Sequence, residues 1–143
     1  MMELAATPPA PMAGRAPDPA AKRVLVVDDE PTILFVTSRM LTTAGYVAIQ
    51  ASGAQEALRL LDLGDPRVDL VITDVVMPET DGRALGRSIA EHHPALPVLY
   101  MSGYPADDVF HRGSPGPDLP FLRKPFSTGS LVAAVQALLA RSA

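Results

Sequence analysis

The sequence predicts an α/β fold in which five parallel strands form one doubly wound sheet with helices on both faces. Short and wholly apolar runs recur along the chain, as is typical of strands that are buried on both faces. Segments with the helical spacing of apolar residues separate these runs, and regular alternation of strand and helix implies right-handed crossovers. The chain has 143 residues, 48% of them hydrophobic, which suits one domain with a proper core.

Five segments are expected to form the strands. They are residues 24–27, 46–51, 70–72, 98–101 and 119–122. The second is the weakest candidate and the fifth is short. If the strand order is 2-1-3-4-5, the first, third and fourth strands are neighbours, and ligands bind at the carboxyl ends of the strands.

Helical patterns lie between the strands. The first helix is expected from Pro31, a residue that suits a first helical turn, to about Ala44, before Gly45. Apolar residues that share one face mark a second, a third and a last helix: Ala54, Ala57, Leu58 and Leu61, then Leu85 and Ile89, then Leu131, Val135, Leu138 and Leu139. Prolines and glycines crowd residues 103–118, so the fourth helix is expected to be short or irregular, near residues 106–111.

Composition limits the organisation and the function. Residues 1–21 are dominated by Ala and Pro and predict a disordered tail, which leaves residues 22–143 as the folded domain. The net charge is −4 and no basic cluster exceeds Arg123-Lys124, so direct nucleic-acid binding is not expected. The chain has no cysteine, no signal peptide and no apolar run of the ~20 residues that a membrane span needs, so we expect a cytoplasmic protein.

Polar residues fall at the ends of the predicted strands. Asp28 and Asp29 follow the first strand, Thr73-Asp74 closes the third, Ser102 ends the fourth and Lys124 ends the fifth. Because the carboxyl ends of parallel strands meet at one edge of the sheet, the three carboxylates are expected to converge, with Ser102 and Lys124 beside them.

Three carboxylates in one pocket repel one another. Two of them ~4 Å apart repel by ~4 kcal/mol at an effective dielectric of ~20, so three pairs cost on the order of 10 kcal/mol. One lysine does not cancel that repulsion, so either a carboxyl group stays protonated or a divalent cation binds. Oxygen ligands favour Mg²⁺ or a similar hard ion such as Mn²⁺. The pocket then suits phosphoryl transfer, with one carboxylate as the nucleophile.

At this point the residues resemble a known family, the response-regulator receiver domains of two-component signalling. Four segments carry the resemblance: Asp28-Asp29-Glu30-Pro31, Thr73-Asp74-Val75-Val76-Met77-Pro78-Glu79-Thr80-Asp81-Gly82, Met101-Ser102-Gly103 and Lys124-Pro125-Phe126. The resemblance covers about residues 23–139. Each segment alone is weakly specific, whereas all of them in order at the right strand ends are highly specific.

The resemblance implies a role for each residue of the acidic pocket. Asp74 is implied as the phosphoacceptor. Asp29 is implied as a direct Mg²⁺ ligand, Asp28 as a ligand that acts largely through water, and the backbone carbonyl of Val76 as a further ligand.

The resemblance also implies a switch. Lys124 is implied to contact the phosphoryl group, with a cis bond to Pro125, and Ser102 to move toward that group on activation. Phe121, three residues before Lys124, stands at the place of the switch aromatic. Ser102 departs from the commoner Thr, and Gly103 stands where Ala is frequent.

The implied function is a phosphorelay step. The domain takes a phosphoryl group from the phosphohistidine of a sensor kinase or of a phosphotransfer protein. It is no enzyme beyond self-catalysed phosphoryl transfer and autodephosphorylation. The chain ends after the last predicted helix, so we expect no attached output domain. The motifs around Ser102 and Phe121 are similar to receivers of hybrid sensor kinases, and the broken fourth helix favours a monomer or a weak dimer.

Several alternatives stay open from the residues alone. Asp28 and Asp29 suit a helix cap, Ser102 suits a turn, and Phe121 suits a plain core position. Two roles stay open for Tyr104: it screens the phosphoryl group from water, or it is part of a surface that binds a partner. An aspartyl-phosphate phosphohydrolase is an alternative function, although Val76 stands where such enzymes typically have a second Asp. The other alternative function is a binding scaffold that acts independently of phosphorylation.

Overall fold

The sheet is the centre of the fold and has the predicted topology. The structure, a computed structural model, describes residues 21–64, 67–75, 77, 82–102 and 121–142. Five strands form one sheet in the order β2-β1-β3-β4-β5, and every neighbouring pair is parallel. The predicted α/β class and the predicted strand order are both confirmed.

The elements follow the predicted alternation. The strands are β1 (Arg23–Val27), β2 (Val47–Ala51), β3 (Leu70–Asp74), β4 (Val98–Ser102) and β5 (Phe121–Arg123). The helices are α1 (Pro31–Thr43), α2 (Ala54–Leu63), α3 (Gly82–His92) and α5 (Thr128–Ser142). The predicted tail and the predicted irregular fourth helix lie outside the described residues.

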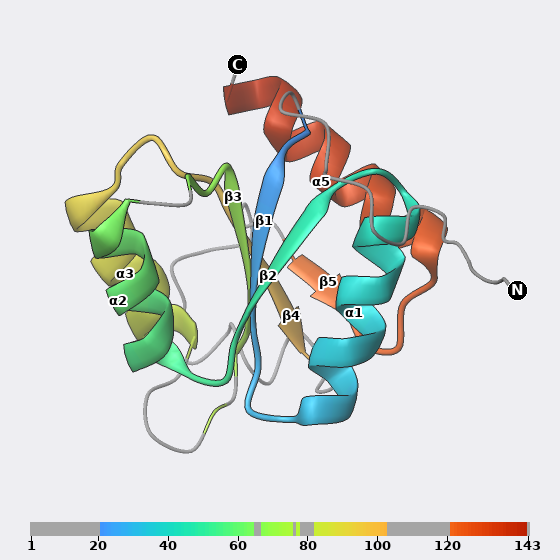
Figure 1. The fold of residues 1–143 in the computed structure, drawn as a ribbon, viewed down its shortest axis with the longest axis horizontal. Coiled ribbons are helices and arrows are strands. Elements are labelled where there is room, and N and C mark those ends of the chain that lie inside the picture. The colour runs from blue at the N-terminus through green and yellow to red at the C-terminus, as the bar shows by residue number, and fades with distance from the viewer. Residues whose placement is uncertain (1–20, 65–66, 76, 78–81, 103–120, 143) are drawn as a thin grey trace, which may run out of the picture.

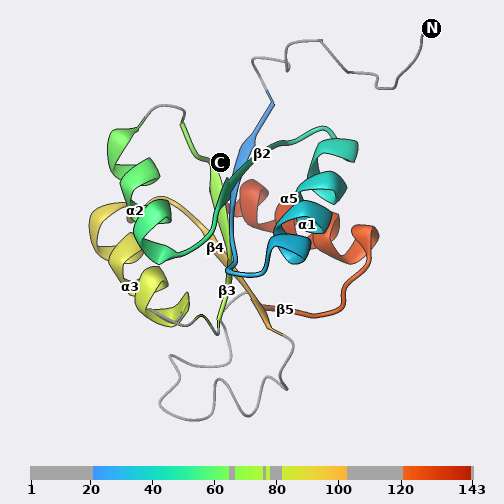
Figure 2. The same cartoon turned by 60° about the horizontal axis from the view of Figure 1, so that its bottom comes forward.

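The helices cover the sheet in two layers. In Figures 1 and 2, α1 and α5 lie on one face of the sheet, and α2 and α3 lie on the other. Alternate residues of each strand enter the two cores: Val24 and Val26 of β1 pack in the α1–α5 core, whereas Leu25 and Val27 pack in the α2–α3 core. The continuous apolar runs of the sequence arise because both faces are buried.

Local chemistry sets the ends of the helices. Pro31 occupies the first turn of α1, where its missing N–H costs nothing. Gly45 ends the turn after α1 with a φ of 100°, a left-handed conformation that favours glycine. At the end of α3, His92 Nδ1 lies 3.0 Å from the carbonyl oxygen of Ser88. His92 therefore contacts its own helix at the helix end.

In the described part of the chain, no helix combines the length and the apolar character that crossing a membrane requires.

Candidate functional site

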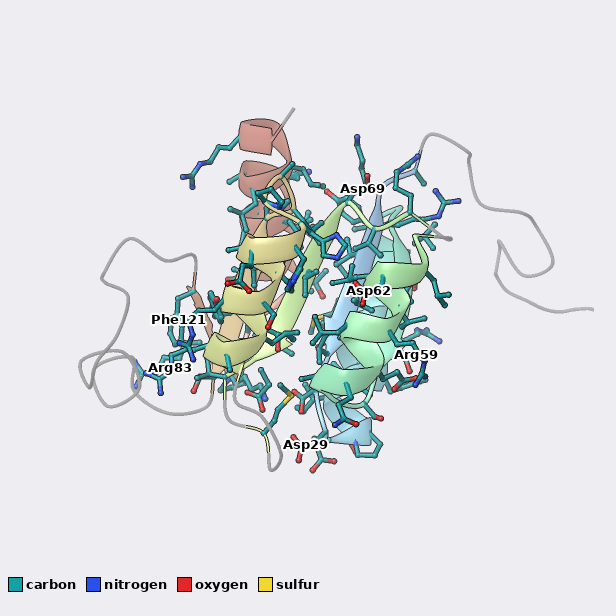
Figure 3. All side chains as sticks on the ribbon, turned by 90° about the vertical axis from the view of Figure 1, so that its left-hand side faces the viewer. Asp29, Arg59, Asp62, Asp69, Arg83 and Phe121 are labelled. Atoms are coloured by element: carbon teal, nitrogen blue, oxygen red, sulfur yellow. The ribbon has the colours of Figure 1, made fainter. Side chains whose placement is uncertain are left out.

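The carboxyl ends of four strands place the predicted site residues at one edge of the sheet. Asp28 follows β1, Asp74 closes β3, Ser102 closes β4 and Lys124 follows β5. Figure 3 shows Asp29 at this edge, whereas Asp69, which precedes β3, lies at the opposite edge. The topology thus brings together residues that are far apart in the sequence, as predicted.

The three aspartates form a compact acidic cluster. One carboxylate oxygen from each of Asp28, Asp29 and Asp74 lies within 4.8 Å of the other two. Asp28 is fully buried and Asp74 is 7% exposed, whereas Asp29 is exposed to solvent. The cluster is therefore an acidic pocket that opens to solvent on the side of Asp29.

Lys124 brings a positive charge into this pocket. Its Nζ lies 3.0 Å from Asp28 Oδ2 and 3.3 Å from Asp74 Oδ1. The backbone N–H of Lys124 donates to the carbonyl oxygen of Ser102 over 2.8 Å, so β4 holds the start of this loop. The Lys124–Pro125 peptide bond is cis, as the resemblance implied.

Asp28 has protein partners for both carboxylate oxygens. Its Oδ1 accepts a hydrogen bond of 2.9 Å from the backbone N–H of Glu30, and its Oδ2 accepts from Lys124. The cap of α1 is Glu30, whose side chain accepts from the N–H of Thr32 over 3.4 Å. The alternative in which Asp28 or Asp29 caps this helix is therefore wrong. The buried carboxylate of Asp28 turns to Lys124 instead.

The electrostatics of the pocket act on Asp74. Burial raises the pKa of its carboxyl group above the ordinary value, because the charged form loses contact with water. The charge of Lys124 lowers the pKa of Asp74, while the charges of Asp28 and Asp29 raise it. Burial and like charges outweigh the one lysine, so the pocket without a cation disfavours the ionised Asp74.

The residues of the pocket fit a hard divalent cation. Three carboxylates converge, and Lys124 supplies one positive charge against them. Carboxylate oxygens are the ligands that Mg²⁺ prefers in proteins, and Mg²⁺ commonly uses one or two of them together with water and phosphate oxygens. A cation here would also relieve the unfavourable charge on Asp74.

Gly82 supports the backbone of Asp74, a role that the sequence did not indicate. Its N–H donates to the carbonyl oxygen of Val75 over 2.7 Å. A Cβ atom at Gly82 would overlap the carbonyl oxygen of Asp74 and would lie 3.0 Å from Val75 Cα. Only a residue without a side chain lets the first turn of α3 rest on this strand end.

The two predicted switch residues lie on the adjacent strands β4 and β5. Ser102 is buried at the end of β4, and Phe121 is half-buried at the start of β5, where it packs against Tyr100 and Val75. The predicted ligand carbonyl of Val76 and the open question of Tyr104 lie outside the described residues.

Comparisons with known proteins identify the family. Residues 24–136 match the model of the response regulator receiver domain. The chain is 38% identical over 117 residues to the sensor kinase CckA of Brucella abortus. This alignment covers 81% of this chain and 12% of the kinase. The chain covers 16% of the two-component response regulator ARR2 of Arabidopsis thaliana and 58% of the transcriptional regulatory protein PdtaR of Mycobacterium tuberculosis, so it spans less than two thirds of the length of these relatives.

Solved structures agree with this match. A response regulator receiver protein from Sinorhizobium medicae superposes with a TM-score of 0.77 at 31% identity, covering 88% of this chain and all of that one, 100%. The response regulator TrrA from Thermotoga maritima, solved in complex with Mg²⁺ and BeF, superposes with a TM-score of 0.69 at 29% identity, covering 82% of this chain and 98% of that one. The chain therefore belongs to the response regulator receiver domain family of two-component signalling.

Proposed function

We propose that this domain accepts a phosphoryl group on Asp74 from a phosphohistidine and holds it as an acyl phosphate. Receiver domains are signalling domains that interact with histidine kinases or with phosphotransfer proteins. One observation carries the proposal for this chain: Asp28, Asp29 and Asp74 converge with Lys124 at the carboxyl edge of the sheet. We assign residues 22–143 to the receiver unit and place the exchange in the cytoplasm.

Receiver domains bind Mg²⁺ at an acidic cluster of this kind, and we propose the same for this pocket, with Mn²⁺ as a substitute. Asp29 would hold the cation directly, because its carboxylate is exposed. Asp28 would act largely through water, which agrees with its two protein partners. Asp74 and the carbonyl of Val76 would complete the protein ligands. When bound, the cation would neutralise charge on the phosphoryl oxygens.

The chemistry is a nucleophilic displacement at phosphorus. A carboxylate oxygen of Asp74 attacks, the P–N bond of the phosphohistidine breaks, and its electron pair stays with the imidazole, which takes up a proton. Lys124 would then turn from Asp74 to a phosphoryl oxygen as a point charge. Ser102 would donate its hydroxyl to another phosphoryl oxygen.

An apolar groove beside the pocket supports a protein partner as the donor. The groove has a volume of about 400 Å³ and lies between α1 and the loop after β5. Its lining residues are Ile33, Val36, Thr37, Met40, Lys124, Pro125 and Phe126. On α1, Phe35 is 61% exposed and Val36 is 40% exposed. Exposed apolar residues next to a reactive centre favour docking of a partner that buries them.

The proposed signal is a change at Ser102 and Phe121. A phosphoryl group adds roughly two negative charges at Asp74. Ser102 would shift toward these charges and free space for Phe121 to turn inward, which alters the surface that begins at β5.

The proposal is tested with a small phosphodonor, such as acetyl phosphate, in the presence of Mg²⁺. Intact mass is expected to rise by one phosphoryl group in the parent and not in Asp74→Asn. Asp62→Asn is the matched control, because Asp62 lies on α2 away from the pocket and its side chain is 72% exposed. Labelling of Asp74→Asn to the level of the parent would show that another residue accepts the group.

A further inference from the structure

Tyr100 of β4 fits into a notch in α3. Tyr100 is only 6% exposed, although it is a large side chain next to the strand end that carries Ser102. A Cβ atom at Gly86 would overlap the Tyr100 hydroxyl oxygen and would lie 2.9 Å from Cζ of the ring. The absence of a side chain at Gly86 therefore makes the space in which the tip of Tyr100 lies.

The same face of α3 also rests on the phosphoacceptor strand. Gly82 and Gly86 are four residues apart and so share one face of the helix. Gly82 contacts the backbone of Asp74 and Val75, and Gly86 contacts Tyr100. Because protein interiors are close-packed, a helix held at both points resists sideways movement of the ring.

The ring of Tyr100 lies between Phe121 and the residue that follows Asp74. Val75, the residue after Asp74, forms a buried cluster with Tyr100, and Phe121 packs against that cluster. Tyr100 is also the register partner of Phe121 in the parallel pair of β4 and β5, so the two side chains stand on the same face of adjacent strands. Figure 3 shows Phe121 on the α3 side of the sheet, at the end of the helix that carries Arg83.

We propose that Tyr100 is the positioning residue that couples the state of Asp74 to the position of Phe121. Held by Gly86, its ring is the fixed surface against which Phe121 lies. A change at the end of β3 reaches Phe121 through Val75 and this ring. The inference rests on the proposed phosphorylation of Asp74 and adds to it the contact that carries the signal to β5.

The variants separate the ring from its hydroxyl. Tyr100→Leu removes the aromatic surface that faces Phe121, whereas Tyr100→Phe keeps that surface and is expected to preserve the coupling. Gly86→Ala pushes the ring out of the notch and is expected to displace Phe121 before any phosphoryl group is present. Val135→Ala opens the core on the opposite face of the sheet and serves as the control for lost stability alone.

Fluorine NMR gives a direct reading of Phe121. The chain has four phenylalanines, so uniform labelling with fluorophenylalanine gives four signals, and Phe121→Leu identifies the one of interest. Each protein is measured with and without Mg²⁺ and beryllium fluoride, a mimic of the phosphoryl group. In Tyr100→Leu, the shift of the Phe121 signal is expected to fall below half of that in the parent. Tyr100→Phe and Val135→Ala are expected to keep it.

Acetyl phosphate labelling of Asp74, measured in parallel, separates the two ways of failing. Labelling of Tyr100→Leu within twofold of the parent, with a reduced Phe121 response, supports the coupling. An equal shift of the Phe121 signal in the parent and in Tyr100→Leu overturns the role of Tyr100 and leaves the assignment of Asp74 as the phosphoacceptor intact. A parent that is labelled but shows no shift of the Phe121 signal has the same consequence. An equal reduction in Val135→Ala also overturns it. A parent that takes up no phosphoryl group overturns the proposed function itself.

Discussion

The ammonium group of Lys124 donates a hydrogen bond of 3.0 Å to Asp28 Oδ2. The Lys124 side chain is 18% exposed and that of Asp28 is 1% exposed, so this ion pair lies largely out of water. Asp74 Oδ1 lies 3.3 Å from the same nitrogen. Two buried carboxylates therefore share one cationic side chain, and this arrangement decides how the protein responds to mutation, pH and metal.

Replacement of Lys124 by Met is expected to destabilise the metal-free protein. Removing one partner of a buried ion pair leaves an uncompensated charge, which costs about 3 kcal/mol or somewhat more. The free energy of unfolding in urea, measured with a chelator, is expected to fall by that amount. Lys22→Met is the matched control, since Lys22 is the other lysine of the chain and is exposed. Equal losses in the two variants would contradict a special role for Lys124.

Asp74→Asn is expected to stabilise the metal-free protein at neutral pH. The pKa of Asp74 is raised in the folded state, mainly by burial, so folding binds a proton between the ordinary pKa and the raised one. The stability from this group is complete below the ordinary value and is lost as the pH rises through the raised pKa. Asn carries no charge and escapes this loss. The thermal midpoint of Asp74→Asn is therefore expected to exceed that of the parent at pH ~7, well above the ordinary Asp pKa of ~3.9.

The pH dependence gives the check on this prediction. As the pH falls toward the ordinary pKa of ~3.9, the parent takes up the proton and the advantage of Asp74→Asn is expected to shrink. A constant difference between Asp74→Asn and the parent from acid to neutral pH would argue against burial of a charged Asp74.

Mg²⁺ is expected to stabilise the protein through the acidic pocket. A ligand that binds only the folded state at 100 times its Kd adds ~2.7 kcal/mol, which thermal unfolding in a Mg²⁺ titration detects. Loss of an outer partner of a metal ligand costs roughly 10- to 100-fold in affinity, and Asp29→Asn is expected to cost at least that much. Glu30→Gln removes the next exposed carboxylate and is expected to keep the Mg²⁺ response. An unchanged titration with Asp29→Asn would exclude Asp29 as a ligand.

Gly82→Ala is expected to destabilise the fold and to disturb Asp74. The new Cβ would overlap the carbonyl oxygen of Asp74, and overpacking of this kind costs about 1–3 kcal/mol. Gly129→Ala is the matched control in α5, where a Cβ would meet only Ser127 Oγ at 3.8 Å. Alanine in a helix is about 1 kcal/mol more favourable than glycine, so this control is expected to be neutral or stabilising. The free energies of unfolding of the two variants are compared in urea. An unchanged free energy of unfolding in Gly82→Ala would contradict the close packing of α3 against the end of β3.

The sequence predicted the strands and the cluster at their ends because both follow from local patterns. Apolar runs mark buried strands, and in a parallel sheet each run ends at the same edge, so Asp28, Asp74 and Lys124 could be brought together before any coordinates. β3 ends at Asp74, as predicted, and Asp74 pairs in register with Met101 of β4. That register depends on a neighbouring strand, which a local sequence pattern does not report.

The contacts of α3 could not be predicted for the same reason. The fit of Gly86 to Tyr100 depends on which faces of a helix and a strand meet and how closely. The identity of the N-cap residue of α1 also depends on a distant residue. The Asp28 carboxylate accepts a hydrogen bond from Lys124 in the pocket, and Glu30 is the N-cap residue. A sequence pattern predicts a contact of this kind only when the position of the distant contacting residue is already known.

Val36→Glu is expected to block phosphorylation by a protein donor while sparing the chemistry at Asp74. Val36 lines the groove between α1 and the loop after β5, and a carboxylate at this position would lose its water when a partner docks on the apolar lining. Transfer from a phosphorylated histidine kinase is expected to slow by at least about tenfold, a loss of ~1.4 kcal/mol. Labelling by acetyl phosphate is expected to stay within twofold of the parent. Leu63→Glu is the matched control, because Leu63 is 66% exposed on α2, outside the groove. Equal slowing of transfer in both variants would place the docking surface elsewhere.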